Sequence, residues 1–395
     1  MGLFKKDELK NLWPFYIERF LAHLLYFAPA FWILQLQQYL SLFQIGILFS
    51  VYALSTFIFE VPTGAFADLY GRKASVIFGY FLSALSVSIL LFFNDFLVML
   101  CIFILWGGAH SFISGAKEAW VVDNLNYKKK KHLVKEFFVK EQAIILVALF
   151  ISGFLGAYLV NKNGLNTIWF FATLSYLVGA ILVFVKEHKI TKEKKSSFSD
   201  LFKHSKTSIK YSLKHKVLFF MICGTFFIML RDSFGGDIVW QPFLKDLGLP
   251  TYAFGFILSA STILGAVATL LTKPISKLFK KEKNYLVFLL VIVILLDTAV
   301  LFVNNYIWGI ILLLLMLISI YMFMPINQNL FHNNVPGKLR ATVTSFNSMI
   351  ISLAYALSFP LSGYLADIIS PKYTIVLGSI FLIPALIFYL KIKQK

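Results

Sequence analysis

Long runs of apolar residues, separated by short polar turns, extend along the whole chain. A helix rises about 1.5 Å per residue, so roughly 20 apolar residues cross the ~30 Å hydrocarbon core of a bilayer. Twelve segments meet this length, and the pattern predicts a membrane-spanning helix in each: residues 14–36, 41–68, 74–93, 96–123, 137–160, 166–185, 217–239, 252–272, 284–303, 307–329, 342–366 and 373–391. The expected fold is an all-α membrane protein.

Composition supports the same class. The chain has 395 residues, of which 59% are hydrophobic and 14% are charged, and its mean hydropathy is +0.77. A soluble domain cannot bury that much apolar surface, so a lipid bilayer is the expected environment. The net charge of +18 comes from cations that cluster between the spans, which argues against a nucleic-acid partner. Cys101 and Cys223 lie inside apolar segments and predict no disulfide.

Lysine and arginine gather in alternate loops, and this predicts the orientation. The basic loops include Arg72 and Lys73, Lys128–Lys131 and the lysines of 186–216. The opposite loops hold three lysines in total: Lys162, Lys245 and Lys372. Because cytoplasmic loops carry an excess of Lys and Arg, we expect the basic side to be the cytoplasm, across a bacterial plasma (inner) membrane. Both termini are basic and fall on that side, which requires an even number of spans.

A long polar segment at the midpoint divides the spans into two sets of six. Residues 186–216 contain ten lysines against Glu187, Glu193 and Asp200. The expected domains are an N-terminal six-helix half over 1–190, a cytoplasmic central loop over 191–216, and a C-terminal six-helix half over 217–395. Within this segment, Phe198–Lys216 predicts either an amphipathic helix on the membrane surface or a solvated linker.

The turn between the second and third predicted spans places an acid, two glycines and two cations within ten residues. Gly64 lacks a side chain, so a neighbouring helix can approach its backbone closely. Asp68 lies one turn further on, and Gly71 permits a sharp reversal of the chain. Arg72 and Lys73 fall at the membrane surface, where anionic headgroups favour them. These are either turn and topology residues alone or a charge relay that ties helix ends together, and the acid at this spacing favours the relay.

This spacing, with all five fixed positions matched, resembles the loop 2–3 signature of the major facilitator superfamily, G-x-x-x-D-x-x-G-R-[KR]. The resemblance implies two six-helix halves around a central cavity and transport by alternating access. It also implies an acidic partner for Arg72 at the end of the fourth span, where Asp123 stands. Together these residues would form a latch that stabilises the outward-facing state.

Carboxyl groups inside the spans are candidates for proton coupling. An ionisable group costs about 2.5–3.5 kcal/mol in a span, so each needs a reason. Glu60 precedes Asp68 by eight residues, hence by ~12 Å of helix, and falls near the middle of the bilayer. Glu118 lies about 7 Å further in than Asp123. Both carboxyls are candidate proton or substrate sites, and the alternative is a structural role in ion pairs or hydrogen bonds.

The first predicted span contains Glu18 and Arg19, one turn or so from its start. The favoured interpretation is a local ion pair, or side chains that extend to the inner surface. Arg19 is also a candidate counter-charge for an anionic substrate.

In the second half, Arg231 and Asp232 fall ~20 Å into the seventh span. Gly235 and Gly236 follow and weaken the helix, and transporters place gates and substrates at such breaks. Asp297 interrupts the ninth span with no cation nearby in sequence, so it requires a partner on another helix or a proton. All three ionisable residues are candidate coupling or substrate groups.

Other chemistry finds no support in the sequence. Phosphate-binding loops, metal-ligand spacings and Ser/His/Asp arrangements are absent, so we expect no enzyme activity and no cofactor. The expected function is secondary active transport by a monomer whose partners are the bilayer, protons and a small-molecule substrate.

Direction and substrate rest on a narrower resemblance. The phrase Glu60-Val-Pro-Thr-Gly is similar to that of some bacterial drug–proton antiporters, which implies proton-coupled export of small hydrophobic or cationic compounds. The fifth span departs from the antiporter signature, because it keeps only Gly153 and Gly156 and lacks the proline. The alternatives are proton-coupled uptake of a small polar or anionic solute, with Arg231 or Arg19 as counter-charge, and a non-coupled facilitator or transporter-like sensor.

Overall fold

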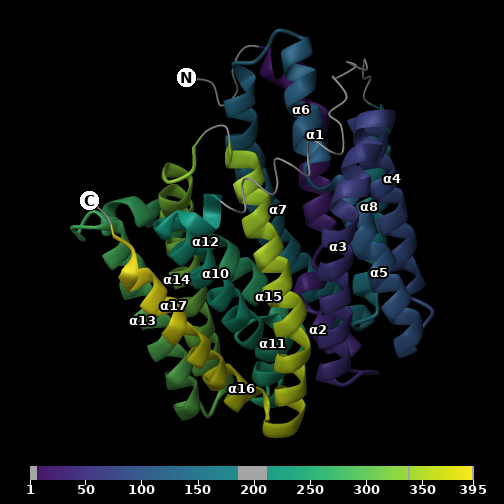
Figure 1. Ribbon diagram of the computed structural model, residues 1–395. Helices are drawn as coiled ribbons and strands as arrows, with labels where there is room; N and C mark the ends of the chain where they lie inside the picture. The colour runs from purple at the N-terminus through teal and green to yellow at the C-terminus, as the bar shows by residue number, and fades with distance from the viewer. Residues whose placement is uncertain (1–6, 186–210, 337–338, 394–395) are drawn as a thin grey trace. The chain divides into compact units, whose positions relative to one another are not determined.

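The computed structural model describes residues 7–185, 211–336 and 339–393, and regular secondary structure in this part of the chain is entirely helical (Figure 1). The predicted surface helix over 198–216 lies largely outside the described residues. The helices follow the predicted spans closely, because long apolar runs can satisfy their backbone hydrogen bonds in a bilayer only within a helix.

The first eight α-helices run from Glu8 to Val185. Their bounds are α1 Glu8–Leu25, α2 Trp32–Leu36, α3 Leu42–Tyr70, α4 Arg72–Ile89, α5 Phe96–Ile113, α6 Ala116–Tyr127, α7 Leu133–Asn163 and α8 Thr167–Val185. A short 3-10 helix, η1 (Ala28–Ala30), separates α1 from α2. The first predicted span is therefore interrupted by the residues between Leu25 and Trp32.

The second set begins after the basic central segment. Its α-helices are α10 Lys216–Phe234, α11 Asp237–Asp246, α12 Ala253–Ser276, α13 Glu282–Ala299, α14 Tyr306–Asn333, α15 Arg340–Ile369, α16 Pro371–Gly378 and α17 Leu382–Lys391. The 3-10 helices η2 (Val300–Phe302) and η4 (Ser379–Phe381) lie after α13 and between α16 and α17.

Ten helices or consecutive helix pairs of the described chain are long and apolar enough to cross a membrane. They are α3, α5 with α6, α7, α8, α10 with α11, α12, α13 with η2, α14, α15, and α16 with α17. Two predicted spans are not among them. In α1, the ionisable residues include Glu18 and Arg19, and α4 begins with Arg72 and Lys73. Charged side chains of both helices take part in ion pairs with other helices.

Glycines break two of the predicted spans. The fourth ends α5 at Ile113 and restarts as α6 at Ala116, with Gly115 between them at φ +69°. Side chains with a Cβ rarely adopt a positive φ, so glycine is favoured there. The seventh breaks between α10 and α11 at Gly235 and Gly236, where the sequence predicted a weakened helix.

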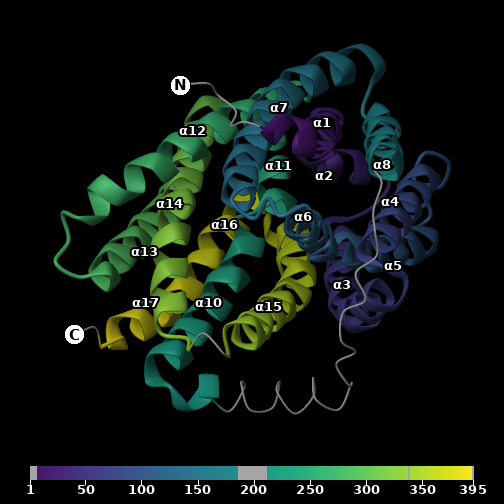
Figure 2. The ribbon, with the colours of Figure 1, turned by 90° about the horizontal axis from the view of Figure 1, so that it is seen from above.

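The described residues form two compact units. Unit 1 comprises the described parts of Met1–Tyr39, Val51–Lys194 and Thr251–Thr262. In it, α4 packs against α5 and α8, and α1 packs against α7 and α8, as Figure 2 shows from above for α4, α5 and α8. Phe15 and Trp120 meet edge to face at 4.9 Å in its core.

Unit 2 comprises the described parts of Leu40–Ser50, Lys195–Pro250 and Ile263–Lys395. Here α10 packs against α15 and α17, and α13 packs against α14 and α17. The beginning of α3 belongs to this unit. Asp367 of α15 accepts hydrogen bonds from the backbone N–H groups of Leu42 and Phe43, at 3.0 and 2.8 Å. These donors have no partner within the helix, so the carboxylate caps α3 from a neighbouring helix.

Candidate functional site

Five charged side chains from α1, α6 and α7 meet within unit 1. We call this set the unit-1 charge cluster: Glu18, Arg19, Lys117, Glu118 and Glu141. Lys117 Nζ lies 2.6 Å from Glu18 Oε1, and Arg19 Nε is paired with Glu141 Oε1. Arg19 Nη2 also lies 3.8 Å from Glu118 Oε1. Ion pairs therefore link three helices.

Glu18 is the most enclosed member, with 1% of its surface exposed. The hydroxyl group of Tyr80, on α4, donates a hydrogen bond of 2.5 Å to Glu18 Oε1, and Lys117 Nζ also contacts that hydroxyl. The second carboxylate oxygen, Oε2, is buried without a hydrogen-bond partner in the described chain. A buried charge is tolerated only when it is paired, so Lys117 and Tyr80 keep Glu18 in place while Oε2 stays open to a proton.

The break at Gly115 gives Lys117 and Glu118 different surroundings. Both lie in the first turn of α6, and consecutive helical residues point about 100° apart because a turn holds 3.6 residues. The Lys117 side chain is only 4% exposed, whereas that of Glu118 is 53% exposed. Glu118 is thus the accessible end of a cluster that is otherwise enclosed.

The cluster contains more acid than base. Three carboxylates face two cations, so it carries one excess negative charge when every group is ionised. The enclosed members are balanced, two acids with two cations, so the excess charge lies at the exposed end of the cluster, on Glu118. One bound proton, or one bound cation, makes the cluster neutral.

The sequence identified only part of this cluster. Arg19 and Glu118 were candidates, and the structure brings them together. Glu18 and Arg19 attract each other, as the local interpretation expected, but each is also paired with a residue of another helix, and neither side chain extends to the surface. Glu141 was missed. An acid inside a predicted span was the available signal.

A second buried network lies beside the beginning of α1. Glu8 is fully buried, and its carboxylate oxygens lie 2.7 and 2.5 Å from Lys140 Nζ. Tyr16 donates a hydrogen bond of 2.9 Å to Glu8 Oε1. The sequence analysis did not single out Lys140 as a site residue. The structure makes it a tie between α1 and α7.

The loop motif forms a contact that the resemblance implied. Arg72 Nη1 is paired with Asp123 Oδ2, which joins the start of α4 to α6. Lys73 Nζ donates a hydrogen bond of 2.9 Å to the carbonyl oxygen of Phe184, near the end of α8. Gly71 has φ +94°, which is the reversal predicted for it.

Three candidates on α3 stand apart from these contacts. Asp68 and Glu60 are exposed, and neither carboxylate makes a hydrogen bond or ion pair with a described residue. The expected close approach at Gly64 is not found, because no described atom lies within 4 Å of where its Cβ would be. Of the predicted latch, Arg72 and Asp123 are joined and Asp68 is not.

The charged candidates of unit 2 make separate partnerships. Arg231 Nε donates a hydrogen bond of 2.9 Å to Asp297 Oδ2, and Arg231 Nη2 contacts Asp297 Oδ1. This planar two-point pair joins α10 to α13, and its side chains are 2% and 0% exposed. Asp297 thus has the partner on another helix that its position required. The neighbouring Asp232 instead accepts a hydrogen bond of 2.8 Å from the hydroxyl group of Tyr355.

The family is decided by comparison with known sequences. The sequence profile of the Major Facilitator Superfamily matches residues 17–358 and 220–395. The chain belongs to the Major Facilitator Superfamily. The resemblance drawn from the loop motif is therefore confirmed.

Two relatives are also members of this superfamily. YxaM of Bacillus subtilis (strain 168), an uncharacterized MFS-type transporter, is 30% identical over 268 residues, which are 65% of this chain and 64% of that relative's length. An uncharacterized MFS-type transporter of Methanocaldococcus jannaschii is 21% identical over 360 residues, 89% of each chain. The superfamily and these relatives are transporters and not enzymes.

Solved structures show the same fold. The nucleoside transporter NupG has a TM-score of 0.75 and 15% identity, over 98% of this chain and 100% of its own. A D-xylose–proton symporter has a TM-score of 0.69 and 14% identity, over 96% and 98%. Among the described residues, no group of three His, Cys, Asp or Glu is placed to hold a metal ion.

Proposed function

We propose that this member of the superfamily is a proton-coupled secondary transporter that exports small hydrophobic or cationic compounds by alternating access. The observation that carries the proposal is the unit-1 charge cluster, in which three carboxylates face two buried cations and one carboxylate reaches solvent. A proton that enters the cluster removes its excess charge, so protonation and the packing of α1, α6 and α7 are coupled.

Glu118 is the group that exchanges the proton. Its side chain is 53% exposed, and it lies 3.8 Å from Arg19. When Glu118 is neutral, the attraction between it and Arg19 is lost, and Arg19 keeps the pair with Glu141 and the attraction of Glu18. Glu18 and Lys117 form the fixed part of the cluster because both are almost fully enclosed. Proton binding at the exposed acid thus changes the forces on a buried arginine.

Accessible charge favours a cationic substrate over an anionic one. Arg19, Lys117 and Arg231 are 13%, 4% and 2% exposed, and each is paired with a carboxylate. Glu60 and Glu118 are exposed acids. A substrate anion would need Arg19 or Arg231 as counter-charge, and would first have to displace a buried partner, which is costly. Uptake of an anionic solute is therefore the weaker alternative.

The same proposal includes the topology. Twelve spans in two six-helix halves, over 1–190 and 217–395 with the loop 191–216 between them, would place both termini in the cytoplasm of a bacterial plasma membrane. The working form would be a monomer. Gly64, Asp68, Gly71, Arg72, Lys73 and Asp123 would act as the cytoplasmic gating motif, with the pair of Arg72 and Asp123 as its joined part.

Proton movement in liposomes tests the function. Purified protein is reconstituted with a pH-sensitive dye inside, a pH gradient is imposed, and lipophilic cations, neutral sugars and small anions are added in turn. The cations are expected to trigger proton movement. Movement only with an anion or a sugar would favour the uptake alternative, and no movement with any class would favour a facilitator or a sensor.

Three variants locate the coupling. Glu118→Gln is expected to lose gradient-driven transport but to keep exchange of labelled for unlabelled substrate, because exchange needs no net proton movement. Glu60→Gln tests the second exposed acid in the same way. Asp246→Asn removes an exposed acid at the end of α11 and serves as the matched control. Unchanged gradient-driven transport by Glu118→Gln would remove the cluster from the mechanism.

A further inference from the structure

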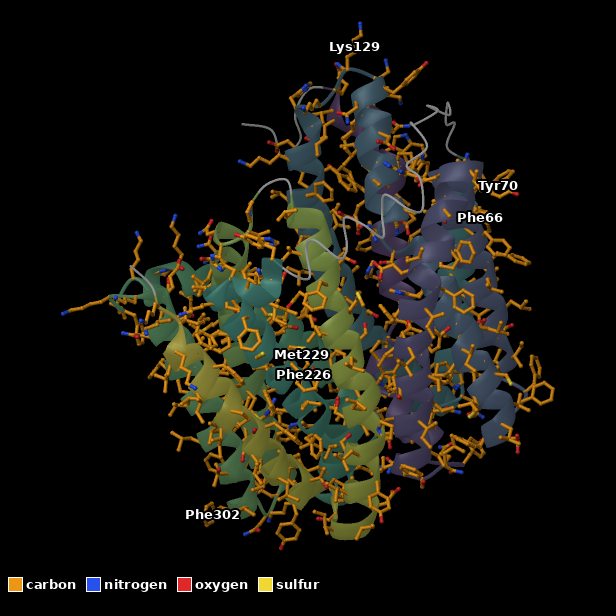
Figure 3. The ribbon with its side chains drawn as sticks, in the orientation of Figure 1. Phe66, Tyr70, Lys129, Phe226, Met229 and Phe302 are labelled. Carbon is orange, nitrogen blue, oxygen red and sulfur yellow. The ribbon has the colours of Figure 1, made fainter. Side chains whose placement is uncertain are left out.

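Unit 2 contains a cavity that is lined by helices of that unit alone. Its volume is about 90 Å³, and its walls come from α10, α13, α14, α15 and α17. Most wall residues are apolar, among them Met229, Leu289, Phe323 and Met324. Figure 3 labels Met229, together with Phe226, on α10. A cavity of this size has room for several carbon atoms, because one water occupies about 30 Å³ of liquid.

One wall of the cavity carries charge. Arg231 and Asp232 both line it, together with the hydroxyl-bearing Ser319 and Tyr355. The guanidinium of Arg231 is neutralised by the two-point pair with Asp297. Asp232 has no cation of its own among the described residues, since its Oδ2 accepts only the neutral hydroxyl of Tyr355. Arg231 also attracts Asp232, so two carboxylates share one guanidinium and this wall carries one negative charge in excess.

We propose that this cavity binds a small aliphatic ammonium ion. The ammonium group donates hydrogen bonds to Asp232, and the carbon chain lies among Met229, Phe323 and Met324. The inference rests on the proposed function, because it assigns a place for the cationic substrate within unit 2. It also names the substrate class as a small monoamine with an apolar body.

Three features select that class. The free oxygen of Asp232, Oδ1, makes no hydrogen bond with a described residue, and an ammonium offers three donors. An anion in the cavity would be repelled by the Asp232 carboxylate. A neutral alcohol of the same shape would gain the apolar contacts but not the charge, and charged hydrogen bonds are roughly twice as strong as neutral ones. Methionine walls adapt to the outline of a chain.

The experiment uses methionine methyl groups as reporters inside the full-length protein. The chain has eight methionines, and two of them, Met229 and Met324, line the cavity. Methyl-labelled protein in detergent is titrated with 3-methylbutylammonium, with 3-methylbutanol and with 3-methylbutanoate, which share one shape but differ in charge. Met229→Leu and Met324→Leu assign the two signals. Met99, fully buried in unit 1, is the internal reference.

The ammonium ion is expected to shift the signals of Met229 and Met324 in a saturable way and to leave that of Met99 unchanged. The alcohol should bind about tenfold more weakly, and the carboxylate should not bind. Asp232→Asn should lower the affinity for the ammonium at least to that of the alcohol. Tyr355→Phe keeps the charge and should retain the affinity to within about threefold. Asp246→Asn should behave as the parent protein.

The ammonium site and proton coupling can each fail without the other. Shifts that are equal for the three compounds, or that persist in Asp232→Asn, would overturn the ammonium site even if protons move with other cations in liposomes. Saturable, Asp232-dependent shifts without any proton movement would support the site and contradict proton coupling. A spectrum of Asp232→Asn that matches the parent in the absence of amine shows that the variant is folded.

Discussion

Each unit of this transporter-family protein buries an arginine among its helices, but the two arginines have very different neighbours. In unit 2, Arg231 meets Asp297 through two parallel contacts, and both side chains are almost fully enclosed. In unit 1, Arg19 is paired with Glu141 and also lies 3.8 Å from Glu118, which is half exposed. One arrangement is closed and balanced in charge. The other is open at one end and has an acid in excess.

This difference separates a structural role from an exchangeable one. Protonating Asp297 would leave Arg231 charged, buried and unpaired, so the pair of unit 2 resists any change of charge. Protonating Glu118 leaves Arg19 with Glu141 and brings the cluster to neutrality. In the proposed function the open cluster exchanges the proton, whereas the closed pair holds α10 to α13.

Breaking the closed pair should have the largest effect on folding. Asp297→Asn leaves Arg231 without a counter-charge, and such changes cost about 3–5 kcal/mol. We expect a large fall in the thermal unfolding midpoint in detergent, or loss of folded protein from the membrane. The double variant Arg231→Met with Asp297→Leu removes both charges and should recover most of the stability. A single variant as stable as the parent would show that the pair is not structural.

Removing Lys117, the cation paired with the enclosed Glu18, should have a smaller effect on stability, and this effect should depend on pH. Lys117→Met removes the cation beside Glu18, but Glu18 can then bind a proton at its open Oε2. The variant should be nearly as stable as the parent in acid and should lose up to about 3 kcal/mol as the pH rises, because Glu18 must then ionise unpaired. Unfolding midpoints measured across the pH range check this.

The matched control for that experiment is Lys117→Met combined with Glu18→Gln, which removes the ionisable partner as well. Its stability should not depend on pH more than that of the parent. A single variant whose loss is equal at acid and alkaline pH would contradict the role given to Glu18. Asp297→Asn, by contrast, leaves an arginine that stays charged across this range, so its loss should not recover in acid.

Each unit also has a tyrosine that donates a hydrogen bond to a carboxylate. Tyr80 donates to the enclosed Glu18, and Tyr355 donates to the half-buried Asp232. Hydrogen bonds to charged groups contribute about 1.5–3 kcal/mol when buried. Tyr80→Phe should cost about 1.5 kcal/mol. Tyr355→Phe should cost about half of that, because water can replace its hydroxyl. Thermal unfolding of both variants measures these losses of stability. Equal losses would show that burial of the carboxylate does not determine how much each hydrogen bond contributes.

The sequence predicted the helices far better than the contacts between them. Span length depends on the local run of apolar residues, so α3, α8 and α15 appear close to their expected bounds. The break at Gly115 was missed because the backbone conformation of a single glycine leaves no mark in a hydropathy pattern. Backbone conformation, with φ +69°, decides that break. It is a property of the fold as a whole.

The candidate site residues were likewise predicted better than the contacts between them. The sequence shows each ionisable residue within a span separately, and Arg19, Glu118 and Asp297 were identified in this way. Their partners depend on which helices pack against each other, and a single sequence does not contain this information. Glu141 was missed although it lies inside the predicted span 137–160, and its partner Arg19 belongs to a helix far away in the sequence. Glu60 was placed near mid-bilayer and has no partner in the described chain.

The pair of Arg72 and Asp123 gives the smallest expected effect on stability and a large one on transport. Its side chains are 24% and 25% exposed, and partly exposed ion pairs contribute about 0–1 kcal/mol. Arg72→Ala should therefore insert and unfold almost as the parent does. A latch pair forms in only one end state of the transport cycle and stabilises that state. Arg72→Ala removes this contact, so the variant should transport poorly in the liposome assay.

Charge reversal of the pair distinguishes a latch from a simple surface contact. Exchanging the two residues, Arg72→Asp with Asp123→Arg, restores the attraction and should recover part of the transport that Arg72→Ala loses. Asp68→Asn should also impair transport, even though Asp68 has no ion pair in the described chain, because a latch residue acts in the state where it is joined. Normal transport by both Asp68→Asn and Arg72→Ala would leave this loop with turn and topology roles alone. Coupling would then depend on the open cluster of unit 1 without help from the motif.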